Sequence, residues 1–190
     1  MPEASASYHH GDLRLACLRA ARELLEEDGS AALSLRAVAR RAGVSPTAPY
    51  RHYADRDALL SAVAADGYHE LAARMVEVNA APATPGELAD VAVAYVLFAV
   101  DHPAMFRAMF SDPCDPDDPQ RAEAGQAVLS YVVEIVQRAF PGADLEATST
   151  AVWALVHGLA FLHLDGKFDT TDRDAMAARI RATVHAVLDR

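Results

Sequence analysis

Apolar residues recur at intervals of three and four along nearly the whole chain, and no stretch alternates in the manner of a β-strand. Between Gly11 and Asp28, for example, Leu13, Cys17 and Leu24 fall on one face of a helix. The pattern predicts an all-α fold of about nine helices. We expect them at about 11–28, 34–43, 45–53, 55–79, 85–100, 104–110, 119–140, 144–165 and 172–189.

Residues that cap helix ends mark several of these boundaries. Ser34 and Asp55 each stand directly before a helical pattern, where a side-chain oxygen can accept a hydrogen bond from the first turn. Ser45 followed by Pro46 is a favourable start for a short helix. The segment Thr84–Glu87 has the spacing of a capping box, so the helix after it should begin there.

Composition excludes several classes of protein. The chain has 190 residues, of which 52% are apolar and 23% charged, as in an ordinary globular protein. The apolar run at 91–100 is shorter than the roughly 20 residues of a membrane-spanning helix, and the N-terminus lacks the pattern of a secretory signal. Cys17 and Cys114 are too few for a disulfide framework. We therefore expect a cytoplasmic protein that does not interact with a membrane.

Metal and catalytic motifs are absent from the sequence. His157 and His163 are six residues apart and point to different faces of one helix, so we predict no metal site and no cofactor. The chain has no Gly-x-Ser-x-Gly elbow, phosphate loop or HExxH motif, and no reactive arrangement of Cys and His. These observations argue against an enzyme.

The negative charge is distributed unevenly. The formal net charge is −10, yet the first 60 residues hold eight Arg and eight acidic residues, so the excess lies in the remainder. Within 34–56, five Arg residues face a single acidic residue, Asp55. A basic segment on an acidic body favours one polyanion-binding surface, although chance clustering of surface Arg is an alternative.

Two short predicted helices joined by a turn at Gly43 have the arrangement of a helix-turn-helix. In such a motif the N-terminal residues of the second helix contact base edges in the major groove, and flanking residues contact phosphates. The residues expected at base edges are Ser45, Thr47 and Ala48, and those expected at phosphates are Arg36, Tyr50, Arg51, His52 and Arg56. Tyr53 should pack inside, whereas Arg40 and Arg41 can equally be solvated charges at a helix end.

The segment LSLRAVARRAGVSPTAPYRHYADRDALLSAV resembles the N-terminal DNA-binding domain of TetR-type (TetR/AcrR) transcriptional regulators. The resemblance runs from YHHGDLR at 8–14 through Leu60 and implies binding to a double-stranded DNA operator with an inverted repeat. One departure is Pro49 within the short second helix, where it removes an N–H and can shorten that helix. An N-terminal arm at Tyr8, His9 and His10 could also reach DNA, although a frayed terminus is the alternative.

The extent of this N-terminal resemblance and the break in the helical pattern after residue 79 indicate two domains. We expect a helix-turn-helix DNA-binding domain at 1–55 and a helical effector-binding and dimerisation domain at 56–190. The helix at 56–79 connects them, and a short Ala, Pro and Thr segment, Ala80–Pro85, interrupts the helical pattern after it.

The helix at 144–165 is apolar on two sides, so one side can pack on its own subunit and the other on a second copy. Together with the last helix it predicts a homodimer through a four-helix interface, while a central helix of a monomer is the alternative. The predicted interface residues are Val152, Leu155, Leu159, Leu162, Ile180, Val184 and Val187. WALVHG at 153–158 and HPAMFRAMF at 102–110 resemble a WHG-like C-terminal subtype of the family, whose last two helices form the dimer.

Large apolar and amphipathic side chains gather in the same part of the chain and could line a pocket with few polar groups. They are Phe98, Met105, Phe106, Met109, Phe110, Tyr131, Trp153 and His157. The resemblance implies a small-molecule effector whose binding changes the separation of the two reading helices, and ordinary core packing is the alternative. The sequence thus predicts a DNA-binding repressor released by a small apolar or amphipathic ligand. A helical ligand-binding dimer without DNA affinity is the alternative, and an enzyme using His157 ranks third.

Overall fold

The computed structural model describes residues 10–110 and 117–188, and its side chains are described from Leu13 onward. The described part contains eight α-helices, two short 3-10 helices and no strand, which confirms the all-α prediction. Tyr8, His9 and Cys114 lie outside the described residues. The elements are α1 (His10–Asp28), η1 (Ser30–Ala32), α2 (Leu35–Arg41), η2 (Pro49–Arg51), α3 (Arg56–Val78), α4 (Pro85–Asp101), α5 (Pro103–Phe110), α6 (Pro119–Ala139), α7 (Leu145–Leu164) and α8 (Arg173–Leu188).

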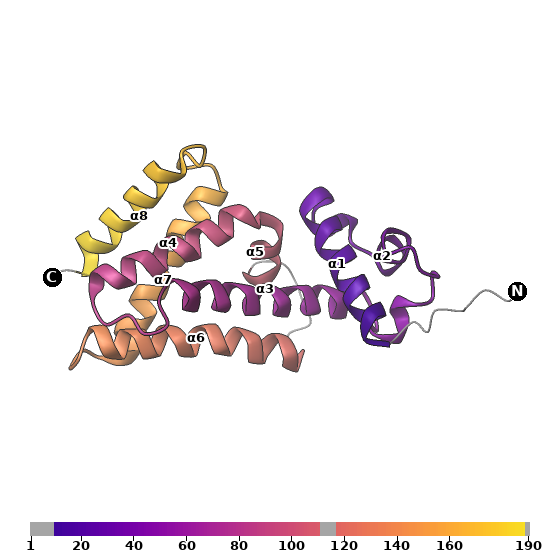
Figure 1. Cartoon of the computed structure of the whole chain (residues 1–190), viewed down its shortest axis with the longest axis horizontal. Coiled ribbons are helices and arrows are strands. Elements are labelled where there is room, and N and C mark those ends of the chain that lie inside the picture. The colour runs from indigo at the N-terminus through magenta and orange to yellow at the C-terminus, as the bar shows by residue number, and fades with distance from the viewer. Residues whose placement is uncertain (1–9, 111–116, 189–190) are drawn as a thin grey trace, which may run out of the picture.

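The long helix α3 forms the axis of the molecule (Figure 1). α1 and α2 lie around its N-terminal end, α6 runs beside it, and α4, α7 and α8 lie toward the other end. Most buried apolar side chains form one core that extends from Leu13 in α1 to Val184 in α8, and a smaller second cluster lies between α4, α6 and α7. Burial of this core is the main driving force that holds the helices together.

The predicted caps are present. The side chain of Ser34 accepts a hydrogen bond from the N–H of Ala37, and that of Asp55 accepts one from Ala58. Thr84 and Glu87 form a capping box, in which the Thr84 hydroxyl accepts from the Glu87 N–H and donates to the Glu87 carboxylate. These caps fix where α2, α3 and α4 begin.

The helix expected at 45–53 differs in the structure. A turn is followed by the short 3-10 helix η2, whose first residue is Pro49. Pro49 has no N–H to donate to the Ser45 carbonyl, and its ring would crowd that oxygen in an α-helix. The amide of Ala48 instead donates to Ser45 over the shorter 3-10 spacing, at 2.9 Å. The departure at Pro49 therefore replaces the short α-helix with a tighter turn.

Helices α4 and α5 meet at a bend of 106°. Pro103 begins α5 directly after the bend, as expected for a residue that cannot continue a helix. α5 packs closely on α3 at Gly67, where an added Cβ would lie 2.7 Å from the Met105 sulfur and 2.8 Å from the Met109 sulfur. Gly67 thus permits the close approach of two helices that both reach the site described below.

One helix, α7, is long and apolar enough to cross a membrane by length and composition alone, with a mean hydropathy of 1.3. This helix is longer than the apolar run at 91–100, which lies within α4. α7 packs against α4 and α6 within the bundle, and 33% of it is buried. A core helix of a helical bundle meets the same criterion, so this is weak evidence for a membrane span. The remaining apolar surface of α7 faces outward from the chain.

Candidate functional site

The segment between α2 and α3 presents a polar edge to solvent. Ser45, Pro46 and Thr47 are exposed, and the hydroxyls of Ser45 and Thr47 lie 3.4 Å apart. Gly43 adopts a positive φ of 68°, which only glycine reaches without strain, and this turns the chain outward after α2. Tyr50, in η2, is 52% exposed. Of the residues predicted for base and phosphate contacts at this edge, Ser45, Thr47, Tyr50 and Arg51 are therefore accessible.

The five arginines of the basic segment fall into two groups. Arg36, Arg40 and Arg51 are exposed and form no ion pair within the described part of the chain. Arg36 and Arg40 are four residues apart, so they lie on one face of α2. Arg41 is different, because its guanidinium contacts Glu23 at 3.2 Å and Glu27 at 2.5 Å. These hydrogen bonds raise the pKa of Arg41 and lower that of Glu27.

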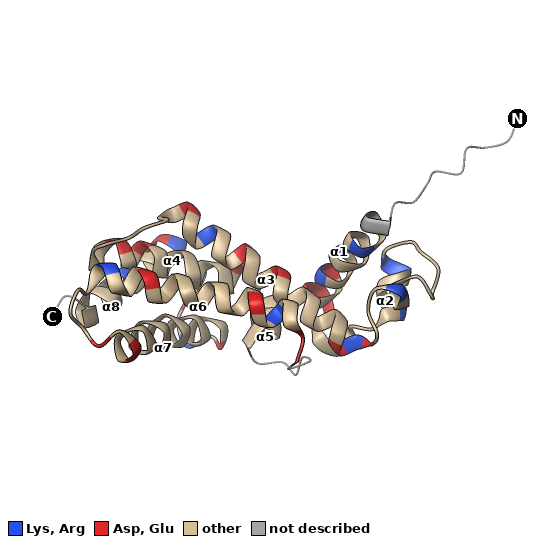
Figure 2. Ribbon diagram, turned by 90° about the horizontal axis from the view of Figure 1, so that it is seen from below, with Lys and Arg blue, Asp and Glu red and all other residues tan. Residues whose placement is uncertain are grey.

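Figure 2 shows basic residues on α2 and acidic residues along much of the remaining ribbon. This arrangement matches the uneven charge seen in the sequence. A polyanion would be attracted to the α2 end of the molecule and repelled elsewhere.

Three of the predicted DNA contacts are placed differently. Ala48 is buried at 9% exposure, so its methyl group packs inward. The Nε2 atom of His52 is buried and has no hydrogen-bond partner among the described residues. Arg56 donates to the Ser30 carbonyl at 2.8 Å and to Asp57 at 3.0 Å. The tight turn at Pro49 rotates Ala48 and His52 inward, and the start of α3 brings Arg56 against η1.

Tyr53 packs inside, at 3% exposure, as the sequence indicated. Its hydroxyl donates to the Arg14 carbonyl at 3.4 Å, and burial raises the pKa of Tyr53. The segment predicted to read DNA, residues 45–53 (the reading segment), is thereby anchored on α1 at its C-terminal end.

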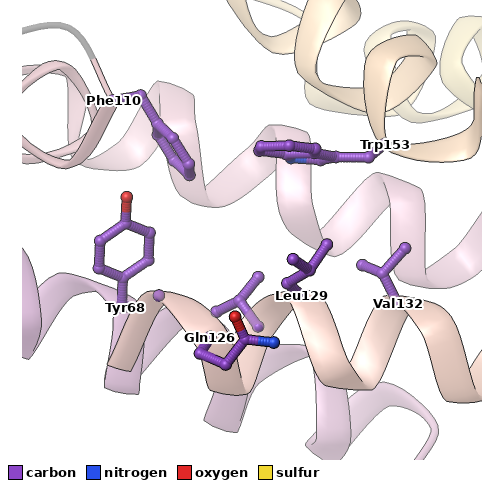
Figure 3. A pocket seen from close by; sticks show the side chains of 8 residues that line it. Tyr68, Phe110, Gln126, Leu129, Val132 and Trp153 are labelled. Carbon is purple, nitrogen blue, oxygen red and sulfur yellow. The ribbon is translucent and has the colours of Figure 1, made fainter. Parts of the chain in front are cut away.

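A cavity of about 200 Å³ lies between α3, α5, α6 and α7 (Figure 3). Phe110 and Trp153 lie on one side, and Gln126, Leu129 and Val132 of α6 lie on the other. The eight lining residues are Tyr68, Phe110, Gly125, Gln126, Val128, Leu129, Val132 and Trp153. The walls are mainly apolar and aromatic, which is typical of small-molecule sites.

Only two of the predicted ligand-binding residues, Phe110 and Trp153, line this cavity. Four other predicted ligand-binding residues are fully buried in the core, because one face of α5 packs between α3 and α4. These residues are Phe98, Met105, Phe106 and Met109. Tyr131 is directed away from the cavity, since its hydroxyl donates to the Asn79 carbonyl at 2.5 Å.

His157 lies behind the cavity in a box of aromatic rings. Its ring centroid is 4.7 Å from that of Phe110 and 5.8 Å from that of Trp153. Its Nδ1 atom shares a hydrogen bond of 3.0 Å with the Tyr95 hydroxyl. Burial lowers the pKa of His157 and raises that of Tyr95, so both groups are held neutral near pH 7.

Six of the lining residues were not predicted from the sequence: Tyr68, Gly125, Gln126, Val128, Leu129 and Val132. Five of them come from α6, whose pairing with α3 is a long-range contact that periodicity does not reveal. Gly125, in the middle of a helix, was the one available signal, because an interior helical glycine commonly has a packing or functional reason.

The residues predicted for the dimer interface fall into a buried group and an exposed group. Val152, Leu159, Ile180 and Val184 are buried within the chain, against α4 and α6, and are not available to a second copy. Leu162 and Val187 are 42% and 48% exposed, and Leu155 is half-buried. The most apolar stripe of each helix packs on its own subunit, because this is where the monomer core lies.

The outward faces of the last two helices carry small residues. In α7 this face contains Ala147, Ala151, Ala154 and Gly158 beside Leu155 and Leu162, and in α8 it contains Ala175, Ala178, Ala182 and Ala186. An added Cβ at Gly158 would meet no atom within 4 Å. A groove along the first half of α7 includes Ala147, Ala151 and Ala154.

α1 is joined to the body by charged contacts. Arg22 donates to Asp66 and Glu70 of α3, both at 2.6 Å. The carboxylate of Glu26 accepts from the N–H groups of Ala104 and Met105, at 3.1 and 3.0 Å. A carboxylate at this position satisfies free amides at the start of α5 and favours the helix dipole. α5 therefore contacts α1 at its first turn and the cavity at its last residue, Phe110.

Within the described residues, no group of three or more His, Cys, Asp or Glu side chains is placed to hold a metal ion. Cys17 is fully buried in the core. The two candidate functional features are the exposed basic edge beside α2 and the apolar cavity between α3, α5, α6 and α7.

Comparison with known proteins agrees with this division. Residues 18–63 match the family model for bacterial regulatory proteins of the tetR family. Residues 88–187 match the model for the tetracycline repressor-like C-terminal domain. An uncharacterized HTH-type transcriptional regulator of Mycobacterium tuberculosis is 24% identical over 153 residues, which cover 80% of this chain and 70% of that protein.

Two solved structures extend the comparison. A protein of unknown function from Rhodococcus sp. RHA1 is 34% identical, covers 98% of this chain and 100% of its own, and has a TM-score of 0.81. The transcriptional regulator FadR from Bacillus subtilis, solved in complex with stearoyl-CoA, shares the fold at 15% identity, with a TM-score of 0.70 and coverage of 90% and 96%. The family models cover both the exposed basic edge and the helices around the cavity, and the chain belongs to the TetR family of bacterial transcriptional regulators.

Proposed function

We propose that the protein is a homodimeric, cytoplasmic, DNA-binding repressor, without enzymatic activity, that a small apolar or amphipathic ligand releases from an inverted-repeat operator. The single observation that carries the proposal is the exposed edge formed by Ser45, Thr47, Tyr50 and Arg51 beside unpaired arginines of α2. An exposed polar turn supplies groups for base edges, and arginines without internal partners are free for phosphates.

The DNA contacts follow from exposure and pairing. Ser45 and Thr47 have hydroxyls that can donate to or accept from base edges. Arg36, Tyr50 and Arg51 are placed for phosphates, and we add Arg40 because it shares a face of α2 with Arg36. Few of these groups make bidentate base contacts, so part of the sequence preference should come from DNA shape.

Dimerisation through the outward faces of α7 and α8 would cover the apolar surface that the monomer leaves exposed. Small side chains allow helices of two subunits to approach closely, and Leu162 adds apolar area at the edge. A two-fold axis there would place two reading segments on one face of a duplex, as an inverted repeat requires.

The dimer is tested by Gly158→Arg in α7, with Ala73→Arg on the exposed face of α3 as the matched control. We expect a folded monomer for Gly158→Arg and a dimer for both the control and the unmodified chain in sedimentation analysis. A Gly158→Arg variant that remains dimeric would place the interface elsewhere.

An effector site is supported by the apolar cavity and by the neighbouring FadR structure, which was solved with stearoyl-CoA bound. A ligand acts as an inducer only if it binds the conformation that does not bind DNA more tightly. A coupling free energy of about 1–3 kcal/mol changes DNA affinity by several-fold to about a hundredfold.

The decisive experiment is selection of genomic fragments by the pure protein, followed by sequencing. A recurrent inverted repeat supports the proposal, and Thr47→Ala should relax the preference for that repeat more than it lowers non-specific affinity. The experiment is done at a salt concentration where the protein is folded and dimeric. If no sequence is enriched, the repressor proposal is refuted, and a ligand-binding dimer that does not bind an operator is supported instead.

A further inference from the structure

The cavity between α3, α5, α6 and α7 carries no charged side chain among its lining residues. Its polar groups belong to Tyr68, Gln126 and Trp153, and the Tyr68 hydroxyl already donates to the Met109 carbonyl at 2.6 Å. An ionised ligand there would lose its hydration without gaining a counter-ion, which is costly. The lining therefore favours an uncharged ligand.

The size of the cavity limits the ligand further. Its volume of about 200 Å³ lies below the range of about 300–1,000 Å³ that is typical for drug-sized ligands. An engineered apolar cavity of about 150 Å³ accommodates benzene, so the present one suits a ring system of about eight to ten non-hydrogen atoms. A long acyl chain attached to a coenzyme does not fit this volume.

The shape of the walls favours a flat molecule. Aromatic rings from three different helices, Tyr68, Phe110 and Trp153, face the aliphatic side chains of α6 (Figure 3). The rings of Tyr68 and Phe110 meet edge to face, with centroids 5.3 Å apart. A Cβ at Gly125 would lie 3.6 Å from the Tyr68 ring, so this glycine leaves the ring uncovered. An aromatic ligand can make offset or edge contacts with such walls.

Gln126 supplies one polar group that can orient a ligand. The Gln126 amide nitrogen lies 3.5 Å from the Ser130 hydroxyl, and its carbonyl oxygen has no donor within the described part of the chain. Gln126 is exposed at the mouth of the cavity, as are Leu129 and Trp153 in part. A ligand with one N–H or O–H group could donate to this oxygen while its ring lies inside.

We propose that the cavity binds an uncharged aromatic molecule of one or two rings, of the phenol or indole class, which donates one hydrogen bond to the Gln126 carbonyl. This deepens the effector site proposed above and rests on it. The ligand class follows from the absence of charge, the small volume and the aromatic walls.

The only tryptophan of the sequence, Trp153, lines the cavity and reports on binding directly. The full-length protein is titrated with p-cresol, with toluene as the ring without a donor and hexanoate as a charged chain of equal size. We expect saturable change of Trp153 fluorescence with p-cresol, and at least tenfold weaker binding of hexanoate. Octanoyl-CoA, which stands for the coenzyme thioesters, should not compete.

Two variants locate the binding site. Gln126→Leu should weaken p-cresol binding by about threefold to tenfold and leave toluene unchanged, since one hydrogen bond is lost. Gln137→Leu, on the exposed face of the same helix, is the control. Gly125→Ala should weaken both ring compounds while raising the melting temperature, because alanine favours the helix more than glycine. A folding defect cannot produce this combination.

The outcomes decide between the alternatives. Equal or tighter binding of hexanoate or octanoyl-CoA, or the absence of any saturable response to p-cresol, would overturn the ligand class. Unchanged p-cresol binding in both Gln126→Leu and Gly125→Ala would overturn its location. These measurements need no DNA, so they are independent of the fragment selection that tests the repressor itself.

Discussion

The salt dependence of operator binding should measure how many arginines contact phosphates. Three arginines of each subunit, Arg36, Arg40 and Arg51, are exposed and form no ion pair within the described part of the chain. A dimer would then make about six such contacts, and at about 0.9 per contact the slope of log affinity against log salt is about −5.4. Arg51→Ala removes one contact from each subunit and should change the slope to about −3.6.

These slopes predict a large and measurable difference. Between about 50 and 200 mM salt, the unmodified protein should lose about 1,800-fold in affinity and Arg51→Ala about 150-fold. Fluorescence anisotropy with a labelled operator, repeated at four or five salt concentrations, gives both slopes.

Arg41→Ala is the matched control, because Glu23 and Glu27 already hold this guanidinium. It should leave the slope unchanged. Equal slopes for Arg51→Ala and the unmodified protein would remove Arg51 from the interface. An equal reduction by Arg41→Ala and Arg51→Ala would refute the argument that internal ion pairs keep an arginine from the DNA.

Three further predictions concern stability and are read from chemical denaturation. Gly67→Ala should lower the free energy of unfolding by about 1 kcal/mol, because crowding against two Met sulfurs outweighs the gain in helix propensity; a more stable variant would contradict the close approach of α3 and α5. Burial lowers the pKa of His157 in the folded protein. The contribution of this histidine to the free energy of unfolding is therefore complete above its unfolded-state pKa of 6.5, and it is lost as the pH falls below that value. Unmodified protein should therefore lose more stability than His157→Gln between pH 7 and pH 5, and equal losses would show that His157 is not responsible. Glu26→Ala should cost about 1 kcal/mol by exposing free amides at the start of α5, whereas Glu123→Ala on exposed α6 should cost little.

Local signals predicted the helices well. The oxygens of Ser34, Asp55 and Thr84 cap the helices that the sequence assigned to them, since a cap depends only on residues a few positions apart. The sequence shows Pro49 as a departure from the family pattern. It does not show whether the remaining N–H groups of this turn form α-helical or 3-10 hydrogen bonds. The structure replaces the expected reading helix with a 3-10 turn, and the Ala48 side chain and the Nε2 atom of His52 are buried as a result.

Long-range packing could not be predicted from periodicity. The sequence grouped Phe106, Met109 and Phe110 together, yet only Phe110 at the end of α5 reaches the cavity. Likewise, two apolar stripes on α7 were visible, but nothing in the sequence indicated which of them packs on α4 and α6. The choice between core and interface at Leu159 depends on α4 and α6, which are at least 20 residues away in the chain.

The continuity of α3 determines how the reading segment is aimed. Asp55, two residues after Tyr53, caps this helix, and the helix then extends without a break through 23 residues, or about 34 Å. One residue inserted within α3 would rotate everything before it by about 100°, turning the basic edge away from a duplex held by the other subunit. The same insertion at 80–84 would leave that helix intact. In the proposed dimer, the pitch of this single helix, rather than a flexible joint, would thus set the direction in which the basic edge faces DNA.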